Sequence, residues 1–233
     1  MAEGKFAIIG LGQFGTSVAK NLSKLGAEVM AIDREIERVD IVKDDVAYAV
    51  ALDSTDIKAL KAQSIHEMDA VLLAIGENVE GLLLTTVLLL ELKVKRIIAR
   101  AVSEQQKIIL QKLGVSEIIL PEDEVGKMTA EMLLNPEIQS FMTLPDGYEI
   151  VEVIVPKRLY GKYLEDADIE NTFNADIIAL RRLFEERNPL GVTEYKEHLI
   201  RNPKDIKSVL QKGDKLVMLA TKKSIKQFLE VNS

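Results

Sequence analysis

The stretch KFAIIGLGQFGTSVAKNLSKLGAEVMAID, residues 5–33, contains the pattern that decides the fold. It opens with a short apolar run rich in β-branched residues, and a glycine-rich turn follows at once. Apolar side chains then recur at helical spacing, at Phe14, Val18, Leu22 and Leu25. A glycine ends this pattern, and a second β-rich run follows at residues 28–32. The stretch therefore predicts a strand, a tight turn, an amphipathic helix and a second strand.

The turn between strand and helix reads Gly10-Leu11-Gly12-Gln13-Phe14-Gly15, which is the pattern G-x-G-x-x-G. The first glycine permits the tight turn, the second lets the backbone approach a pyrophosphate, and the third lets the helix pack against the strand. The start of the helix adds free N–H groups and the positive end of the helix dipole. A purely structural glycine turn is the alternative, but the position between strand and helix favours a phosphate-binding loop.

Asp33 ends the second strand, 23 residues after Gly10. At that position a carboxylate can accept hydrogen bonds from both ribose hydroxyls of a nucleotide. The same negative charge disfavours a 2′-phosphate, so no NADP-type ligand is expected unless Arg34 compensates. The loop and Asp33 together predict an adenine-nucleotide site of the Rossmann type.

Strand-like and helix-like segments alternate repeatedly through the first part of the chain. The expected strands are short and nearly continuously apolar, as parallel strands covered on both faces are. They lie at residues 5–9, 28–32, 46–51, 70–75, 95–100 and 117–120. This alternation predicts an α/β fold, with a doubly wound parallel sheet and right-handed crossovers.

The alternation of strands and helices ends after a helix expected from residue 123 to about 134. We expect a nucleotide-binding domain over 1–136, a linker over 137–147, and a small α+β domain over 148–233. The small domain contains expected strands at 148–155, 175–181 and 215–220, with helices at 167–174 and from 224 onward. A unit of this size gains stability from contacts with partners.

Ligands of such sheets lie over the carboxyl ends of the strands. The candidate site residues at or just after the ends of these strands are Asp53, Ser54, Thr55, Ala74, Ile75, Gly76, Arg100 and Glu122. For the first three, a helix cap is an alternative role. Arg100 closes a buried run and needs an anionic partner, which is either a ligand phosphate or a salt bridge to Glu122 or Asp123.

Composition narrows the classes of function. The chain has 30 Lys and Arg residues and 37 Asp and Glu residues, so the formal net charge is −7 and nucleic acid is not an expected partner. The absence of cysteine excludes disulfides and thiolate metal sites and is compatible with a reducing cytoplasm. No signal-peptide pattern opens the chain, and its most apolar stretch is too short to span a bilayer. We expect a soluble, cytoplasmic protein.

A dehydrogenase with a small substrate domain is the alternative function, but it lacks an evident proton donor. His66 precedes the fourth strand, at the sheet edge opposite the ligand, and His198 lies in a charged stretch. No tyrosine is followed four residues later by lysine. The sequence therefore favours a non-enzymatic role.

Residues 7–35, together with the segments ALDSTD, LLAIGEN, LLLTTVLLLELKVKRIIARA and LGVSEIILPEDEVG, resemble the regulatory RCK (KTN) domain of TrkA/KtrA-type subunits of bacterial potassium uptake systems. GKYLEDADI and VLQKGDKLVML resemble the RCK C-terminal (TrkA-C) domain. The resemblance implies homodimers that assemble into an octameric ring, bind ATP, ADP or NAD(H), and act on a membrane potassium channel or transporter of the TrkH/KtrB type. It places the chain at the inner face of the cell membrane, held there by its partner.

The resemblance also assigns roles to residues. The glycine loop and Asp33 match the nucleotide motif, the residues after strands three and four match contacts near adenine and ribose, and Arg100 takes the place of a basic phosphate contact. Glu122 matches an acidic residue that can lie near a bound divalent cation. Where ATP-selective members have arginine, this chain has Gln13, which favours NAD(H), ADP or AMP over ATP. Residues 184–203 are longer and more charged than the usual hairpin, which weakens the transfer of a cyclic di-AMP site.

Overall fold

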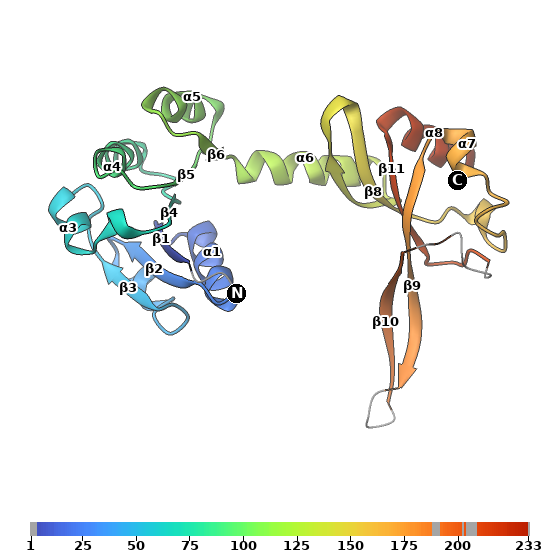
Figure 1. Cartoon of the computed structure of the whole chain (residues 1–233), viewed down its shortest axis with the longest axis horizontal. Helices are drawn as coiled ribbons and strands as arrows, with labels where there is room; N and C mark the ends of the chain where they lie inside the picture. Colours follow the sequence, from blue (N-terminus) through green and yellow to red (C-terminus); the bar gives the residue numbers. More distant parts are fainter. Residues whose placement is uncertain (1–3, 188–191, 202, 204–208, 233) are drawn as a thin grey trace. The chain divides into compact units, whose positions relative to one another are not determined.

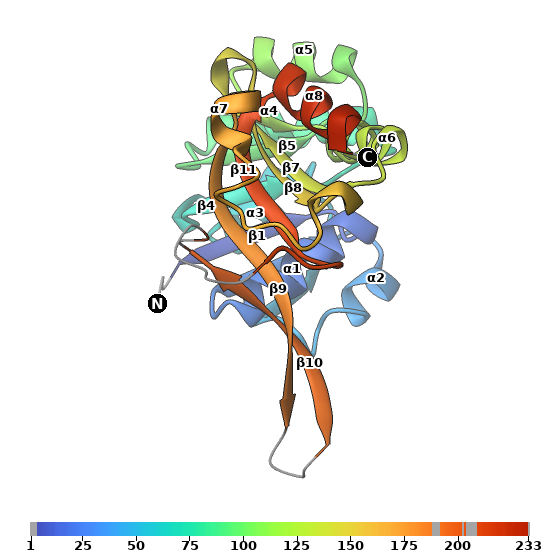
Figure 2. The ribbon, with the colours of Figure 1, turned by 90° about the vertical axis from the view of Figure 1, so that its right-hand side faces the viewer.

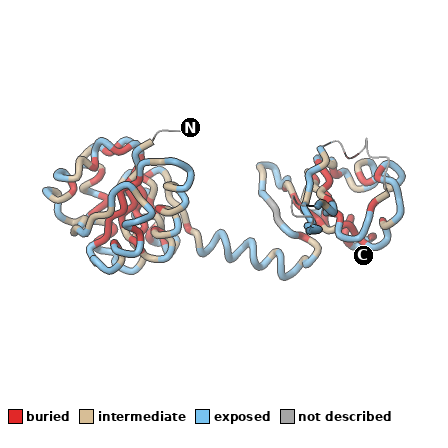
Figure 3. Tube along the Cα trace, turned by 90° about the horizontal axis from the view of Figure 1, so that it is seen from below, coloured by how far each residue is buried: buried red, intermediate tan, exposed pale blue. Residues whose placement is uncertain are grey.

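The computed structural model describes residues 4–187, 192–201, 203 and 209–232 (Figure 1). The chain divides into two compact units, Met1–Glu124 and Val125–Ser233. Figure 3 shows the buried residues gathered in each unit separately.

The first unit is built on a six-stranded parallel sheet with the order β3-β2-β1-β4-β5-β6. Its strands are β1 Lys5–Ile9, β2 Glu28–Asp33, β3 Tyr48–Ala51, β4 Ala70–Leu73, β5 Ile97–Arg100 and β6 Glu117–Ile119. This is the strand order of dinucleotide-binding folds, with the reversal between β1 and β4. The predicted doubly wound parallel sheet is confirmed.

Helices cover both faces of this sheet, because successive side chains of a strand point to opposite faces. One core cluster contains Ile8 with Ala19 of α1 and Val39 of α2, and the other contains Ile9 with Leu82 of α4. The helices are α1 Gln13–Lys24, α2 Ile36–Asp40, α3 Ile57–Ala62, α4 Val79–Glu91 and α5 Glu104–Leu113, with a short 3₁₀ turn, η1 Ile65–Glu67. Figures 1 and 2 show them arranged around the strands.

The apolar pattern used to predict α1 extends one position too far. Leu25 follows the last residue of α1 and is 78% exposed, so it does not belong to the buried stripe. In α4, which is apolar nearly all round, Leu82 and Leu89 are fully buried while Leu84 and Val87 are exposed. This helix therefore packs against its own unit and also presents an apolar surface.

The second unit contains a five-stranded antiparallel sheet with the order β10-β9-β11-β8-β7. Its strands are β7 Ile138–Thr143, β8 Tyr148–Ile154, β9 Asp176–Arg187, β10 Thr193–Ile200 and β11 Lys215–Thr221. Its shorter elements are η2 Pro145–Gly147, η3 Lys157–Leu159, α7 Ile169–Phe173 and α8 Lys222–Asn232. Phe228 of α8 is fully buried and meets the ring of Phe173 edge to face, with centroids 5.5 Å apart. The predicted second α+β unit is present.

The segment 137–147, expected as a linker, contains β7 instead. Ile138 is 7% exposed and pairs with Val153, and the ladder continues to Thr143 opposite Glu149. The turn η2 then joins β7 to β8 as a hairpin. Only this turn was recognised from sequence, because β7 is an edge strand whose formation depends on its partner. The assignment of residues 1–136 and 148–233 to two family domains stays a prediction.

The helix α6 Pro121–Leu134 begins two residues earlier than expected. It has no buried residue along its length, as Figure 3 shows. Its exposed apolar side chains are Val125, Met128, Met132, Leu133 and Leu134.

The segment predicted to be long and charged, residues 184–203, is described in part. Residues 184–187 and 193–200 form the outer part of the β9–β10 ribbon. Residues 188–191 and 202 of this segment lie outside the described residues, as do residues 204–208 beyond it.

The core of the second unit also contains an ion pair. Arg182 donates through Nε to Asp214 Oδ1 at 2.8 Å and through Nη2 to Asp214 Oδ2 at 2.6 Å. The side chains are 9% and 2% exposed. Asp214 Oδ2 also accepts the backbone N–H of Gln211, so the carboxylate fixes the turn before β11.

Candidate functional site

The glycine loop has the geometry that its sequence predicts. Gly10 has φ +97°, in the region that favours glycine, and donates its N–H to the Ile32 carbonyl at 2.8 Å. A Cβ on Gly15 would lie 1.9 Å from the Gly10 carbonyl oxygen, so only glycine lets α1 approach β1 this closely. A Cβ on Gly12 would meet no atom within 4 Å. The second glycine therefore leaves open space beside the start of α1.

Asp33 holds this loop against β2. The residue is 7% exposed, and its carboxylate accepts the Leu11 N–H at 2.7 Å through Oδ2 and the Glu35 N–H at 3.0 Å through Oδ1. The Leu11 side chain points into the core, so Leu11 contributes to the loop through its backbone. Arg38 Nη1 lies 3.9 Å from Asp33 Oδ2, whereas the Arg34 side chain is 66% exposed.

The segment after β3 is organised by its own side chains. Asp53 Oδ1 accepts the Thr55 hydroxyl at 2.7 Å and the Thr55 N–H at 2.9 Å, and these hydrogen bonds hold the pKa of Asp53 below its usual range. Ser54 Oγ lies 2.8 Å from Oγ1 of Thr85, a fully buried residue of α4. The cap of α3 is Asp56, which accepts the Lys58 N–H at 2.8 Å. Residues 53–55 therefore do not cap that helix.

Arg100, the last residue of β5, forms an ion pair with Glu122, in the first turn of α6. The Arg100 guanidinium carbon lies 5.7 Å from the ring centroid of Phe14, and a Cβ on Gly76 would come within 2.8 Å of Arg100 Nη1. Arg100 Nε is buried and has no hydrogen-bond partner among the described residues. The pKa of Glu122 is lowered, first by a hydrogen bond to its own backbone N–H and then by Arg100. The salt bridge anticipated as an alternative for Arg100 is thus formed with Glu122.

A cavity of ≈ 1310 Å³ lies over the carboxyl ends of the parallel strands. Fourteen of the candidate residues line it: Gly10, Gly12, Gln13, Phe14, Asp33, Arg34, Asp53, Ser54, Thr55, Ala74, Ile75, Gly76, Arg100 and Glu122. Leu11 and Gly15 do not, because the Leu11 side chain lies in the core and Gly15, within α1, faces the Gly10 carbonyl. The predicted residues are therefore gathered at one cavity. Their contact with a nucleotide remains a prediction.

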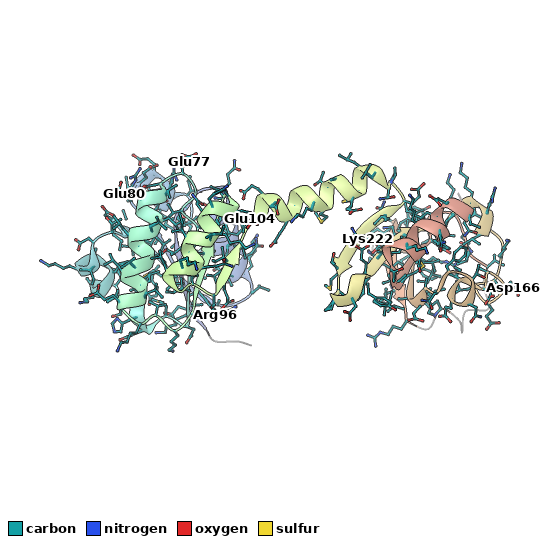
Figure 4. The ribbon with its side chains drawn as sticks, turned by 90° about the horizontal axis from the view of Figure 1, so that it is seen from above. Glu77, Glu80, Arg96, Glu104, Asp166 and Lys222 are labelled. Atoms are coloured by element: carbon teal, nitrogen blue, oxygen red, sulfur yellow. The ribbon has the colours of Figure 1, made fainter. Side chains whose placement is uncertain are left out.

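Sequence reasoning missed several residues that line the same cavity. They include Glu35, Arg38, Glu80, Leu84, Val102 and Gln106; Glu77 and Asn78, which sequence reasoning placed after the fourth strand, line the cavity too. Asn78 caps α4 by accepting the Gly81 N–H at 2.9 Å, and Figure 4 shows Glu77 and Glu80 at the start of that helix. Arg38 could have been noticed in the sequence, because this cation lies shortly after Asp33, in the next helix. Three arginines and several carboxylates thus share the cavity wall.

The sequence also led to expectations about a metal site, about the two histidines and about membrane-spanning segments. The described residues include no group of three or more His, Asp or Glu side chains that could hold a metal ion, and Glu122 is paired with Arg100. His66 lies in η1 with its side chain 48% exposed, and His198 accompanies Glu186 on the β9–β10 ribbon. Neither histidine lines the cavity. Within the part of the chain that the structure describes, no helix is both long enough and apolar enough to cross a bilayer.

Comparison with known proteins adds independent information. A family model described as the TrkA-N domain matches residues 6–121. Ktr system potassium uptake protein C of Bacillus subtilis is 36% identical over 178 residues, which cover 76% of this chain and 80% of that protein. Ktr system potassium uptake protein A of the same organism is 31% identical over 224 residues, 96% of this chain and 95% of that protein.

Solved structures support the fold. The GsuK channel superposes with a TM-score of 0.65 over 99% of this chain, which spans 39% of that chain, at 14% identity. The GsuK RCK domain gives 0.64 over 99% of this chain and 48% of that one, also at 14% identity. At this identity the likeness establishes the RCK-type fold alone.

The relatives that establish the family are potassium uptake proteins and not enzymes, so the prediction of a non-enzymatic chain is confirmed. The resemblance noted in the sequence is confirmed as well. With curated relatives this similar over most of its length, the chain belongs to the TrkA-N family of Ktr and Trk potassium uptake proteins.

Proposed function

We propose that this chain is a cytosolic regulatory subunit that binds an adenine nucleotide in the cavity above β1 and β2 and controls a membrane potassium transporter. One observation carries the proposal: a glycine loop, the carboxylate of Asp33 and the guanidinium of Arg100 converge on one cavity in a member of a potassium-uptake family. Loop N–H groups and Arg100 suit the phosphates, and Asp33 suits the ribose hydroxyls.

The cavity wall favours particular nucleotides. Asp33 disfavours a 2′-phosphate, and Gln13 brings no positive charge to a terminal phosphate. We therefore infer NAD(H), ADP or AMP as preferred ligands, with ATP bound without strong selectivity. The described residues offer no group of side chains that would hold a divalent cation on their own, so a cation at Glu122 would enter together with the nucleotide phosphates. The proposal includes no cyclic di-AMP site in the second unit.

Assembly into homodimers and an octameric ring is part of the proposal. Two apolar surfaces support it: α4 exposes Val87 and, at the edge of the cavity, Leu84, and α6 exposes five apolar side chains. Surfaces of this kind are typical of subunit contacts. In this arrangement α6 is the lever that transmits the nucleotide state of the first unit, and the transporter holds the ring at the inner face of the membrane.

Native mass spectrometry of the purified full chain tests the binding step and the assembly together. We expect a ring that retains adenine nucleotide, released in the same spectrum as a mass assignable to NAD(H), ADP, AMP or ATP. Titration calorimetry of the nucleotide-free protein then ranks the affinities. A protein that retains no nucleotide and gives no heat with any of them at millimolar concentration would contradict the proposal.

A further inference from the structure

Arg100 is held from three sides at the cavity wall. Its guanidinium lies over the ring of Phe14, passes against Gly76 and pairs through Nη2 with Glu122 Oε1. The first two contacts restrict where the guanidinium can lie, and the third neutralises its charge. The buried Nε, with no hydrogen-bond partner among the described residues, shows that these contacts leave part of its donor capacity unused.

The two partners of this ion pair differ in their surroundings. The Arg100 side chain is 18% exposed, whereas that of Glu122 is 62% exposed. An exposed carboxylate loses little when water replaces its partner, so such pairs contribute weakly to stability. A phosphate that enters the cavity brings more charge and several acceptor oxygens to the same guanidinium. A phosphate in the cavity would therefore be a stronger partner for Arg100 than the exposed carboxylate of Glu122.

Glu122 also lies in the first turn of α6, the helix that leads out of the first unit. Its carboxylate thus links the start of α6 directly to the guanidinium of Arg100, which lines the cavity. Loss of this ion pair removes the link that Arg100 makes between the cavity and the first turn of the helix, whose other acidic side chains, Asp123 and Glu124, do not line the cavity.

We propose that Glu122 competes with the phosphates of the bound nucleotide for Arg100, so that phosphate binding releases the first turn of α6. This inference rests on the proposed function and adds to it a positioning residue and a route of transmission. It makes Glu122 an internal anion that lowers affinity for phosphate-bearing ligands. A role for Glu122 as a ligand of a nucleotide-bound cation requires the opposite, because loss of the carboxylate would then weaken binding.

Calorimetry in EDTA, repeated with added Mg²⁺, separates these cases, because a cation-ligand role makes Glu122→Gln bind more weakly only when the cation is present. Full-length protein, freed of nucleotide, is titrated with adenosine, ADP and NADH in three forms: wild type, Glu122→Gln and Glu124→Gln. Glu124 is the matched control because it lies in the same turn, carries the same charge and does not line the cavity. Glu122→Gln should tighten ADP and NADH by roughly two- to fivefold, as expected for loss of an exposed ion pair, and leave adenosine unchanged. Glu124→Gln should change none of the three affinities by more than the small effect of removing one negative charge from the protein.

Hydrogen exchange of peptides that cover residues 121–128 provides the second readout. In the wild type, ADP should accelerate exchange in the first turn of α6, whereas Glu122→Gln should exchange fast already and not respond to ADP. The inference is overturned if the affinity of Glu122→Gln for ADP is no higher than that of the wild type or of Glu124→Gln. It is also overturned if ADP leaves the exchange of these amides unchanged in the wild type. A wild type that binds neither ADP nor NADH would overturn the proposed function as well.

Discussion

Replacing Gly15 by alanine should damage the fold of the first unit, because the added methyl group has no room. The new Cβ would lie 1.9 Å from the Gly10 carbonyl oxygen and 3.0 Å from its carbonyl carbon. A carbon–oxygen contact needs about 3.3 Å, so α1 and β1 must separate by about 1.4 Å. Both neighbours are backbone atoms that cannot rotate away. We therefore expect a cost near the upper end of the overpacking range, about 3 kcal/mol.

The matched control is Gly12→Ala, three residues earlier in the same loop. Gly12 has φ −67° and ψ −173°, which alanine adopts readily, and its Cβ would meet no atom within 4 Å. Alanine is a poorer helix cap than glycine but restricts the unfolded chain, and these effects of about 0.5–1 kcal/mol oppose each other. The methyl group instead occupies the space through which a pyrophosphate would approach. Gly12→Ala should therefore fold normally and bind nucleotide at least about tenfold more weakly, as for the loss of a charge-assisted hydrogen bond.

Differential scanning calorimetry and nucleotide titration of the two variants provide the assay. For a unit of this size, about 3 kcal/mol corresponds to a fall in melting temperature of roughly 10 °C for Gly15→Ala. Gly12→Ala should melt within a few degrees of the wild type. Equal melting of Gly15→Ala and wild type, or equal destabilisation by both substitutions, would refute the assignment of separate roles to the two glycines.

The remaining predictions concern binding and the second unit. Asp33→Ala should weaken nucleotide binding by about 1.5–3 kcal/mol, because the ribose loses its acceptor and the Leu11 N–H loses its partner; unchanged calorimetric affinities for NADH, ADP and ATP would count against the site. Gln13→Arg should tighten ATP more than ADP, since only ATP places a further charge there, and an equal gain in titrations of both would indicate a general field effect. Arg182→Met should destabilise the second unit by about 3–5 kcal/mol, measured by urea unfolding, because Asp214 would stay buried without its countercharge; a loss below about 1 kcal/mol would show that water reaches Asp214.

The sheet and most of the cavity were predictable because they follow from local patterns and topology. The bounds of β1 were predicted to the residue, and its apolar run needs no distant partner to be recognised. Once a parallel sheet is accepted, the residues that follow β3, β4 and β5 must meet at one edge. This is why Asp53, Ile75 and Arg100 could be placed at one cavity without coordinates.

The features that sequence reasoning missed depend on contacts between distant residues. β7 forms because Ile138 packs against Val153 and the strand pairs with β8, and nothing in 137–147 alone requires a strand. Leu25 continues a helical pattern, yet the helix has already ended there. Arg100 had two neighbouring acids as candidate partners, and only the geometry of β6 and the start of α6 selects Glu122.

Potassium flux through the cognate membrane transporter, reconstituted in liposomes with this chain, tests the central claim most directly. A ligand can shift the regulator only by its difference in affinity for two shapes of the ring. Flux is measured with NAD+, NADH, ADP, ATP and no nucleotide, for the wild type and for Gly12→Ala, with co-purification confirming that each complex forms. The account predicts that flux through the wild-type complex differs between nucleotides, and that the Gly12→Ala complex responds to none of them at concentrations that saturate the wild type. Equal flux under all five conditions in a wild-type complex that has bound nucleotide would contradict it.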